Sequence, residues 1–276
     1  MIAPVDCIKD FKILGHLYWA TKLFLRIITS FTNPKSKKII AVPADAYPDI
    51  KIYQAYYNPK TQKHLDPQFI PFESKSCTKY FADQVILDIY DSGFMNNAHY
   101  FGVVSWRIWE KIICREDIRA FIAATAHENY DFYYFSGRIL KTKKTRLWQQ
   151  ANFWHRSDLT TYTEKMIREL GFDCTLTDLQ TVPGYYSYQI CRTPLYRDYV
   201  ENFLKPIKSK MDDLSDIQLQ QWVNQDANYA RYGDTVQVEE LRKITGYPFY
   251  TKHAFITERL FPTYATLKGW RGKAID

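Results

Sequence analysis

The stretch YFGVVSWRIWEK, residues 100–111, decides the fold of this chain. Its first seven residues are a β-branched and aromatic run, which is typical of a buried strand. The charged stretch RIWEKI (107–112) follows directly and has helical character. A strand that passes into a helix is the unit from which α/β domains are built, so these residues predict a domain of that class.

The same alternation occurs on both sides of this stretch. Upstream, KIYQAYY (51–57) predicts a strand and FADQVILDIY (81–90) predicts a helix. Downstream, residues 115–129 predict a helix, and YDFYYFSG (130–137) predicts a third buried strand. Strands that alternate with helices predict a mixed, largely parallel sheet, whose ligands gather at the carboxyl ends of the strands.

The first 49 residues have a different character. Residues 11–30 are strongly apolar, but four side chains interrupt them with roughly helical spacing: Lys12, His16, Lys22 and Arg26. This pattern predicts an amphipathic helix rather than a membrane-spanning one. A linker with two prolines follows it over residues 41–49, with VPADAYPD at its centre. We therefore expect a helix and linker over residues 1–49 and one domain over residues 50–276.

The amphipathic helix has two interpretations, which the sequence leaves open. With the basic stretch PKSKK (34–38) behind it, the helix could lie on an anionic membrane surface. Alternatively, it packs on the domain or on a second protomer of a homo-oligomer. The segment lacks the small-residue cleavage site of a signal peptide, so we expect a cytoplasmic protein, with peripheral membrane contact under the first interpretation.

Composition narrows the class of partner. A net charge of +7 and a pI near 8.9 favour anionic partners, namely nucleotides, diphosphates, nucleic acid or an anionic membrane. The 22 Tyr and 7 Trp offer flat faces that suit stacking on bases or sugar rings. The five cysteines are scattered without a CxxC, and no HExxH, G-x-S-x-G or Walker-type motif occurs. A disulfide framework, a zinc hydrolase and a phosphate-loop enzyme are therefore not supported.

Several segments, taken in order, resemble one family. They are KIYQAYYN, LDPQFIPF, YFGVVSWRIWEK and YDFYYFSG, then RLWQQANFWHRSDLTTYTEKMIRELGFD (146–173), YSYQICRTP (186–194) and FITERLFPTY (255–264). Their order over residues 50–265 resembles uncharacterised bacterial and viral proteins that are described as GT-A-type sugar transferases. Tyr188 departs from the family pattern, because it stands where the family has the asparagine of a Tyr-Cys-Asn sequence.

The resemblance implies a GT-A-like, Rossmann-like single domain behind the amino-terminal helix. It implies a glycosyltransferase of glycan biosynthesis that moves a sugar from a nucleotide-sugar donor to a glycan or another hydroxyl acceptor. Glu258 would be the first catalytic residue, in the first turn of a helix that faces the cleft, where it would accept the proton of the acceptor hydroxyl or bind a sugar hydroxyl. Asp131 would be a second catalytic residue, as a metal or sugar ligand. The alternative is structural, with Thr257 capping that helix and Arg259 pointing outward.

Further residues suit the binding of donor or acceptor by their chemistry. Aromatic faces would stack on base or sugar, amides and hydroxyls would bind sugar hydroxyls, and guanidinium groups would bind phosphate oxygens. The candidates are Tyr53, Gln54, Tyr56, Trp106, Arg107, Trp148, Gln149, His155, Tyr186, Ser187 and Arg259. For each aromatic residue, packing in the core is the competing interpretation.

The diphosphate of the donor raises the question of a metal. Many GT-A enzymes present an Asp-x-Asp pair to Mn²⁺ or Mg²⁺, and this sequence contains no Asp-x-Asp. Either a lone carboxylate such as Asp131 binds a divalent ion, or the guanidinium groups of Arg107, Arg138 and Arg259 replace that ion.

The alternative function is a non-enzymatic protein that binds nucleic acid or carbohydrate, with KTKKTR (141–146) as a phosphate-contacting loop.

Overall fold

The computed structural model of the chain describes residues 47, 49–75, 77–112, 117–135, 146–181, 187–229 and 238–275. All of them belong to one compact unit, Ala41–Asp276. The expected amino-terminal amphipathic helix lies outside the described residues, and so does most of the expected linker. The division at residues 49 and 50 therefore stays a prediction.

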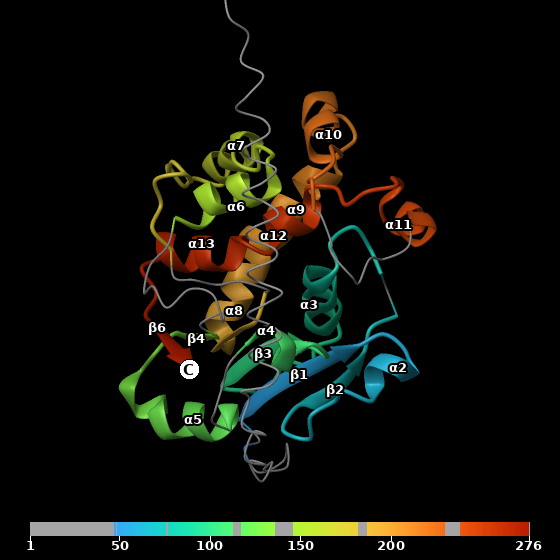
Figure 1. Cartoon of the computed structure of the whole chain (residues 1–276). Coiled ribbons are helices and arrows are strands. Elements are labelled where there is room, and N and C mark those ends of the chain that lie inside the picture. Colours follow the sequence, from blue (N-terminus) through green and yellow to red (C-terminus); the bar gives the residue numbers. More distant parts are fainter. Residues whose placement is uncertain are drawn as a thin grey trace, which may run out of the picture. The chain divides into compact units, whose positions relative to one another are not determined.

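A mixed sheet of six strands lies at the centre of this unit, in the order β2-β1-β3-β5-β4-β6 (Figure 1). The strands are β1 (Ile50–Tyr56), β2 (Ile70–Glu73), β3 (Tyr100–Ser105), β4 (Phe132–Phe135), β5 (Gln189–Arg192) and β6 (Gly272–Ile275). Strand β5 runs antiparallel to both of its neighbours, and every other neighbouring pair is parallel. The predicted α/β domain with a mixed, largely parallel sheet is thus confirmed, and it is compatible with a Rossmann-like fold.

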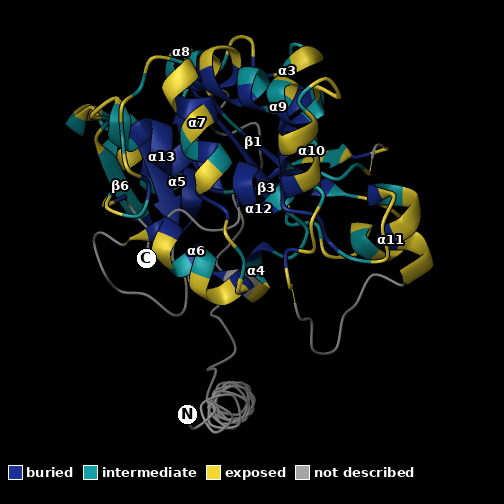
Figure 2. Ribbon diagram, turned by 90° about the horizontal axis from the view of Figure 1, so that it is seen from above, coloured by how far each residue is buried: buried dark blue, intermediate teal, exposed yellow. Residues whose placement is uncertain are grey.

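Helices cover both faces of the sheet (Figures 1 and 2). On one face lie α4 (Ile108–Lys111) and α5 (Ile118–Thr125), which ends in a 3-10 turn, Ala126–Glu128. The other face carries α3 (Ala82–Asp91), α6 (Leu147–His155), α7 (Thr161–Glu169), α8 (Thr193–Tyr199), α9 (Lys205–Asp212), α10 (Ile217–Val223), α12 (His253–Thr257) and α13 (Leu260–Leu267). A π-helical stretch, Val200–Leu204, joins α8 to α9, and two further helices are α2 (Pro59–Gln62) and α11 (Val238–Thr245).

The central strands are buried on both faces, which explains why their sequences are almost continuously apolar. Along β1, Ile50 and Ile52 pack into the core beneath α5, whereas Tyr53 and Ala55 pack into the core beneath α3. Gly102 in β3 allows the close approach of β5, because a Cβ there would lie 2.6 Å from Ile190 Cγ1 and 2.9 Å from the Gln189 carbonyl oxygen.

The strands predicted over residues 51–57, 100–106 and 130–137 correspond to β1, β3 and β4, and the helix predicted over residues 81–90 corresponds to α3. Two short strands at the edges of the sheet, β2 and β6, were not expected. Their sequences, IPFE and GKAI, contain a proline and a glycine, which are typical of turns rather than strands. Edge strands tolerate both residues because one side of the strand makes no ladder hydrogen bonds.

Candidate functional site

The carboxyl ends of five strands lie at one edge of the sheet, because all strands but β5 run in the same direction. Strand β5 begins at that edge, next to the end of β3, and the hydroxyls of Ser105 and Tyr188 are hydrogen bonded there. Helix α3 leads back to the start of β3, so its own first turn also lies toward the carboxyl edge. Ligands of open α/β sheets bind at this edge.

A buried carboxylate, Asp83, lies in the first turn of α3 at this edge. It is 3% exposed, and its Oδ2 accepts hydrogen bonds from Thr257 Oγ1 at 2.7 Å and from Ser187 Oγ at 3.3 Å. Burial, opposed by the two hydroxyl donors and assisted by the charge of the Glu258 carboxylate, raises the pKa of Asp83 to about 7. Asp83 therefore exchanges a proton close to neutral pH.

Glu258 and Arg259 follow Thr257 directly and form an ion pair with Arg259 Nη1 3.4 Å from Glu258 Oε2. The Glu258 side chain is 23% exposed, whereas that of Arg259 is 4% exposed. Arg259 Nη1 also donates to the Phe255 carbonyl oxygen at 2.6 Å. The guanidinium therefore lies behind the Glu258 carboxylate and holds it, and burial keeps it from a phosphate in solution.

These positions correct two expectations about the Thr257–Glu258–Arg259 sequence. Glu258 follows the last residue of α12 as its C-cap rather than opening a helix, and α13 begins only at Leu260. Pro262 explains the break, because it has no N–H to bond the Glu258 carbonyl and continue one helix through both segments. In the alternative interpretation, Arg259 pointed outward and Thr257 was a helix cap. Instead, Arg259 is buried and the Thr257 hydroxyl donates to Asp83.

His155, the last residue of α6, lies beside the same group. Its ring is 4.2 Å from the ring of Phe255, and its Nδ1 is 3.0 Å from the Ala227 carbonyl oxygen. Burial, together with the charge of Arg259, lowers the pKa of His155 to about 4. The imidazole is thus neutral at pH 7, with Nδ1–H donating to Ala227 and Nε2 carrying the lone pair.

Several residues around these side chains have a positive φ. Four non-glycine residues with positive φ are neighbours of site residues or belong to the site: Phe81 (φ 47°), Arg156 (φ 45°), Ser187 (φ 55°) and Asn228 (φ 49°). Phe81 is the clearest case, because its ψ of −113° falls outside the left-handed helical region as well. Strained conformations persist where the surrounding structure forces them, and they cluster at functional sites.

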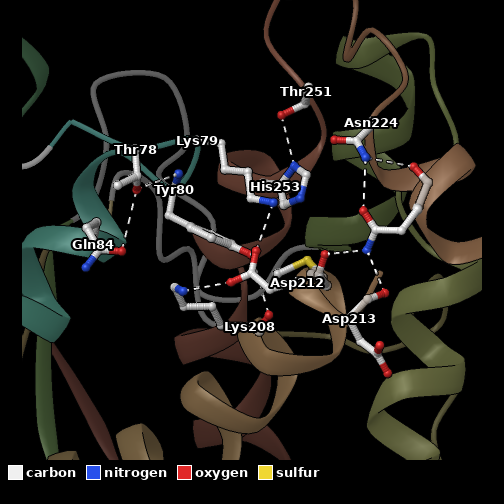
Figure 3. A network of polar contacts seen from close by, with 12 residues as sticks. Thr78, Lys79, Tyr80, Gln84, Lys208, Asp212, Asp213, Asn224, Thr251 and His253 are labelled. Carbon is white, nitrogen blue, oxygen red and sulfur yellow. Dashed lines mark hydrogen bonds and ion pairs between the residues drawn. The ribbon is translucent and has the colours of Figure 1, made fainter. Parts of the chain in front are cut away.

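A polar network fixes the start of α3 against α9 and α12 (Figure 3). Tyr80 donates its hydroxyl to Asp212 Oδ1 at 2.8 Å, and the ammonium groups of Lys79 and Lys208 each lie 2.8 Å from the same carboxylate. Although burial opposes it, these donors lower the pKa of Asp212 to about 2. The ring of Tyr80 packs edge-on against His253, the first residue of α12, at 5.3 Å. Asp83 and Thr257 are thereby held in fixed positions.

Gln189, the first residue of β5, carries a further buried donor. Gln189 follows Ser187 by two residues and is 1% exposed. Its Nε2 has no hydrogen-bond partner within the described part of the chain. A buried amide nitrogen without an acceptor is costly, and a ligand oxygen would satisfy it.

A second set of predicted residues lies at the same edge, at the end of β3. The ring of Trp106 is 5.2 Å from that of His64, and the Arg107 guanidinium lies 5.5 Å from the Trp106 ring. Arg107 also pairs with Glu110 at 2.7 Å. Tyr56, half-buried, is the last residue of the neighbouring strand β1. These residues form an aromatic and cationic surface next to β5.

Other predicted residues have structural surroundings. Tyr53 is buried and donates to the Phe94 carbonyl oxygen, and Gln54 is buried and accepts from the Asp66 N–H at 2.7 Å. Trp148 is fully buried in the core, where its Nε1 donates to Thr263 Oγ1 at 2.9 Å. Gln149 lies on the exposed side of α6. Tyr186 and Arg138 lie outside the described residues.

Asp131 lies at the opposite edge of the sheet, because it precedes β4 rather than following it. Its Oδ2 accepts from the Arg271 N–H at 2.7 Å, and its Oδ1 lies 3.6 Å from Arg192 Nη1. These contacts join the start of β4 to β5 and to the start of β6. We therefore leave Asp131 out of the site.

The structure thus brings together Glu258, Arg259, His155 and Ser187, and it adds Asp83 and Thr257, which the sequence did not single out as site residues. Asp83 carries no local signal, because an aspartate in the first turn of a helix is common for reasons of the helix dipole alone. In the described ranges, no group of three or more His, Cys, Asp or Glu side chains is arranged to hold a metal ion.

Comparisons with family models, with curated proteins and with solved structures find no match to this chain. No described helix has both the length and the apolar character needed to cross a membrane. The interpretation of the site therefore rests on its geometry and chemistry.

Proposed function

We propose that this chain is a glycosyltransferase, which moves a sugar from a nucleotide-sugar to a hydroxyl acceptor on a GT-A-like domain. The observation that carries the proposal is the arrangement around Glu258. One partly exposed carboxylate lies at the ligand-binding edge of the sheet, with a buried guanidinium and a buried, protonatable carboxylate behind it. Such an arrangement suits a general base that has to be held in one orientation.

Glu258 would act on the acceptor. As the acceptor hydroxyl oxygen forms a bond to the anomeric carbon, the bond from that carbon to the diphosphate oxygen breaks, and the nucleoside diphosphate leaves with the electron pair. The hydroxyl proton passes to Glu258. Arg259, which contacts Glu258 and the backbone of α12, is a positioning residue. Asp83 in its neutral form removes one negative charge from beside the Glu258 carboxylate.

The donor would occupy the adjacent strand ends. The Trp106 ring offers a flat face for a base or sugar, and stacking of this kind contributes about 1–3 kcal/mol per base. Arg107, beside it, suits a phosphate oxygen. We derive no step through a metal ion, because the carboxylates described at this edge do not form a ligand set.

Isothermal titration of the purified chain with a panel of nucleotide-sugars, and with the corresponding nucleoside diphosphates, tests the proposal. We expect saturable binding to one nucleotide class, weakened by Trp106→Ala. As a control, Trp109→Ala replaces a tryptophan that packs on Phe69, in the core on the face of the sheet that α4 and α5 cover. Absence of binding at millimolar ligand, together with salt-dependent binding of polynucleotide, would instead favour the non-enzymatic nucleic-acid-binding alternative.

A further inference from the structure

The two sides of α6 differ sharply in character. Its inner side is buried in the core through Leu147, Trp148, Ala151 and His155. On its outer side, Phe153 is 71% exposed and Trp154 is 41% exposed. Large aromatic side chains exposed on a helix that is otherwise packed on the core leave apolar surface in water, and such surface suits an interaction site.

Positive charge accompanies these aromatic residues. Arg146 and Arg156, which flank α6 at its two ends, are both exposed. The helix itself contains no Asp or Glu, and the sequence has none between Asp131 and Asp158. The carboxylate of Asp158 is engaged at the start of α7, where its Oδ1 accepts from Thr160 and Thr161.

We propose that this surface, made of Arg146, Phe153, Trp154 and Arg156 and here named the α6 outer face, docks on an anionic lipid membrane. Tryptophan and phenylalanine with flanking arginines are the composition of helices that lie in the membrane interface, where the rings enter the headgroup region and the cations meet lipid phosphates. A polynucleotide fits less well, because its binding rests on several phosphate contacts, and this face offers two cations, Arg146 and Arg156.

The position of α6 relates this surface to the candidate site. His155 belongs to the same helix and points inward to Phe255 and the Arg259 charge. One side of α6 therefore contributes to the site while the other contacts the membrane. The inference does not depend on the proposed glycosyl transfer, because membrane docking can be measured without any substrate.

Co-sedimentation of the full chain with phosphatidylcholine vesicles, with and without phosphatidylglycerol, tests the proposal. We expect binding only to the anionic vesicles. The double variant F153S/W154S should bind at least about tenfold more weakly, since two large apolar side chains no longer leave water. The matched control is L214S/I217S, because Leu214 (81% exposed) and Ile217 (67% exposed) are more accessible as a pair than Phe153 and Trp154 but are flanked by Asp213 and Asp216.

The contradicting results are distinct. The proposal is overturned if the wild-type chain does not bind anionic vesicles, or if F153S/W154S binds as tightly as wild type, which would assign any binding to another segment. Equal weakening of vesicle binding by both double variants would also overturn it. So would a wild-type chain that binds polynucleotide but not vesicles, if F153S/W154S loses the polynucleotide binding. As a second measurement on a milder variant, W154F should lose most of the vesicle-induced blue shift of tryptophan fluorescence; an unchanged shift would place Trp154 outside the lipid.

Discussion

Replacing Asp83 by asparagine tests the protonation state at the centre of the site. The pKa of Asp83 is about 7 in the folded chain, compared with 3.8 as its ordinary value. The folded state therefore binds more protons than the unfolded state between about pH 4 and pH 7, and the stability of the wild type falls as the pH rises through this window. Three pH units at about 1.36 kcal/mol each give a loss of about 4 kcal/mol.

The Asp83→Asn variant keeps a side-chain oxygen that can accept from Thr257 and Ser187, but its amide does not titrate. At pH 4 both proteins carry a neutral side chain at this position, and their free energies of unfolding should be similar. At pH 8 the variant should be more stable than the wild type by up to about 4 kcal/mol, because it carries no buried charge.

Urea unfolding of both proteins from pH 4 to pH 8 measures this difference. The control is Asp173→Asn, since the Asp173 side chain is fully exposed (100%) and its replacement should give a difference that varies little with pH. A flat difference for Asp83→Asn as well would refute the reasoning, because it would mean that the carboxylate is solvated or ionised throughout.

Three other changes give expected outcomes. The pKa of His155 is about 4, below its ordinary 6.5, so its contribution to stability is lost as the pH falls from about 6.5 to 4. His155→Gln should reduce this loss of unfolding free energy at acid pH by up to about 3 kcal/mol, as measured by urea unfolding. An unchanged loss at acid pH would contradict this. Gly102→Ala should cost about 1–3 kcal/mol, since its Cβ would meet Ile190 at 2.6 Å; wild-type stability would show that β5 can move away. Trp148→Phe should lower the free energy of unfolding by about 1–3 kcal/mol, because side-chain volume and the hydrogen bond to Thr263 are lost. The same change at the exposed Trp154 should lower it by less than about 0.5 kcal/mol in water. Similar losses for the two variants would contradict the burial of Trp148.

The central strands could be predicted because they are buried on both faces. Runs such as FGVV and FYYF have few alternatives to a buried strand, and the helix between them shows its own apolar spacing. The edge strands β2 and β6 could not, since Pro71 and Gly272 remove the local signal and pairing with a neighbour alone makes these segments extended. Pairing between distant segments leaves no trace in a short window of sequence.

The candidate site was predictable only in part. The sequence singled out Glu258 and Arg259 because an acid and a base occur within an apolar run, and the structure shows the base buried and the acid partly exposed. It could not show that Asp83, 174 residues earlier, accepts a hydrogen bond from Thr257. Asp131 illustrates the opposite problem, since a carboxylate next to a strand is informative only when the end of the strand that faces the ligand is known.

Donor turnover by Glu258→Gln tests the role of the Glu258 carboxylate most directly. Once a nucleotide-sugar that binds has been identified, release of nucleoside diphosphate in the presence of an acceptor is compared between the wild type, Glu258→Gln and the control Glu201→Gln, whose carboxylate lies on the exposed surface of the π-helical stretch. We predict that Glu258→Gln binds the donor within a few-fold of wild type but turns over at least about 100-fold more slowly, while Glu201→Gln is unchanged. Turnover by Glu258→Gln at the wild-type rate would contradict the central claim that Glu258 is the base of glycosyl transfer.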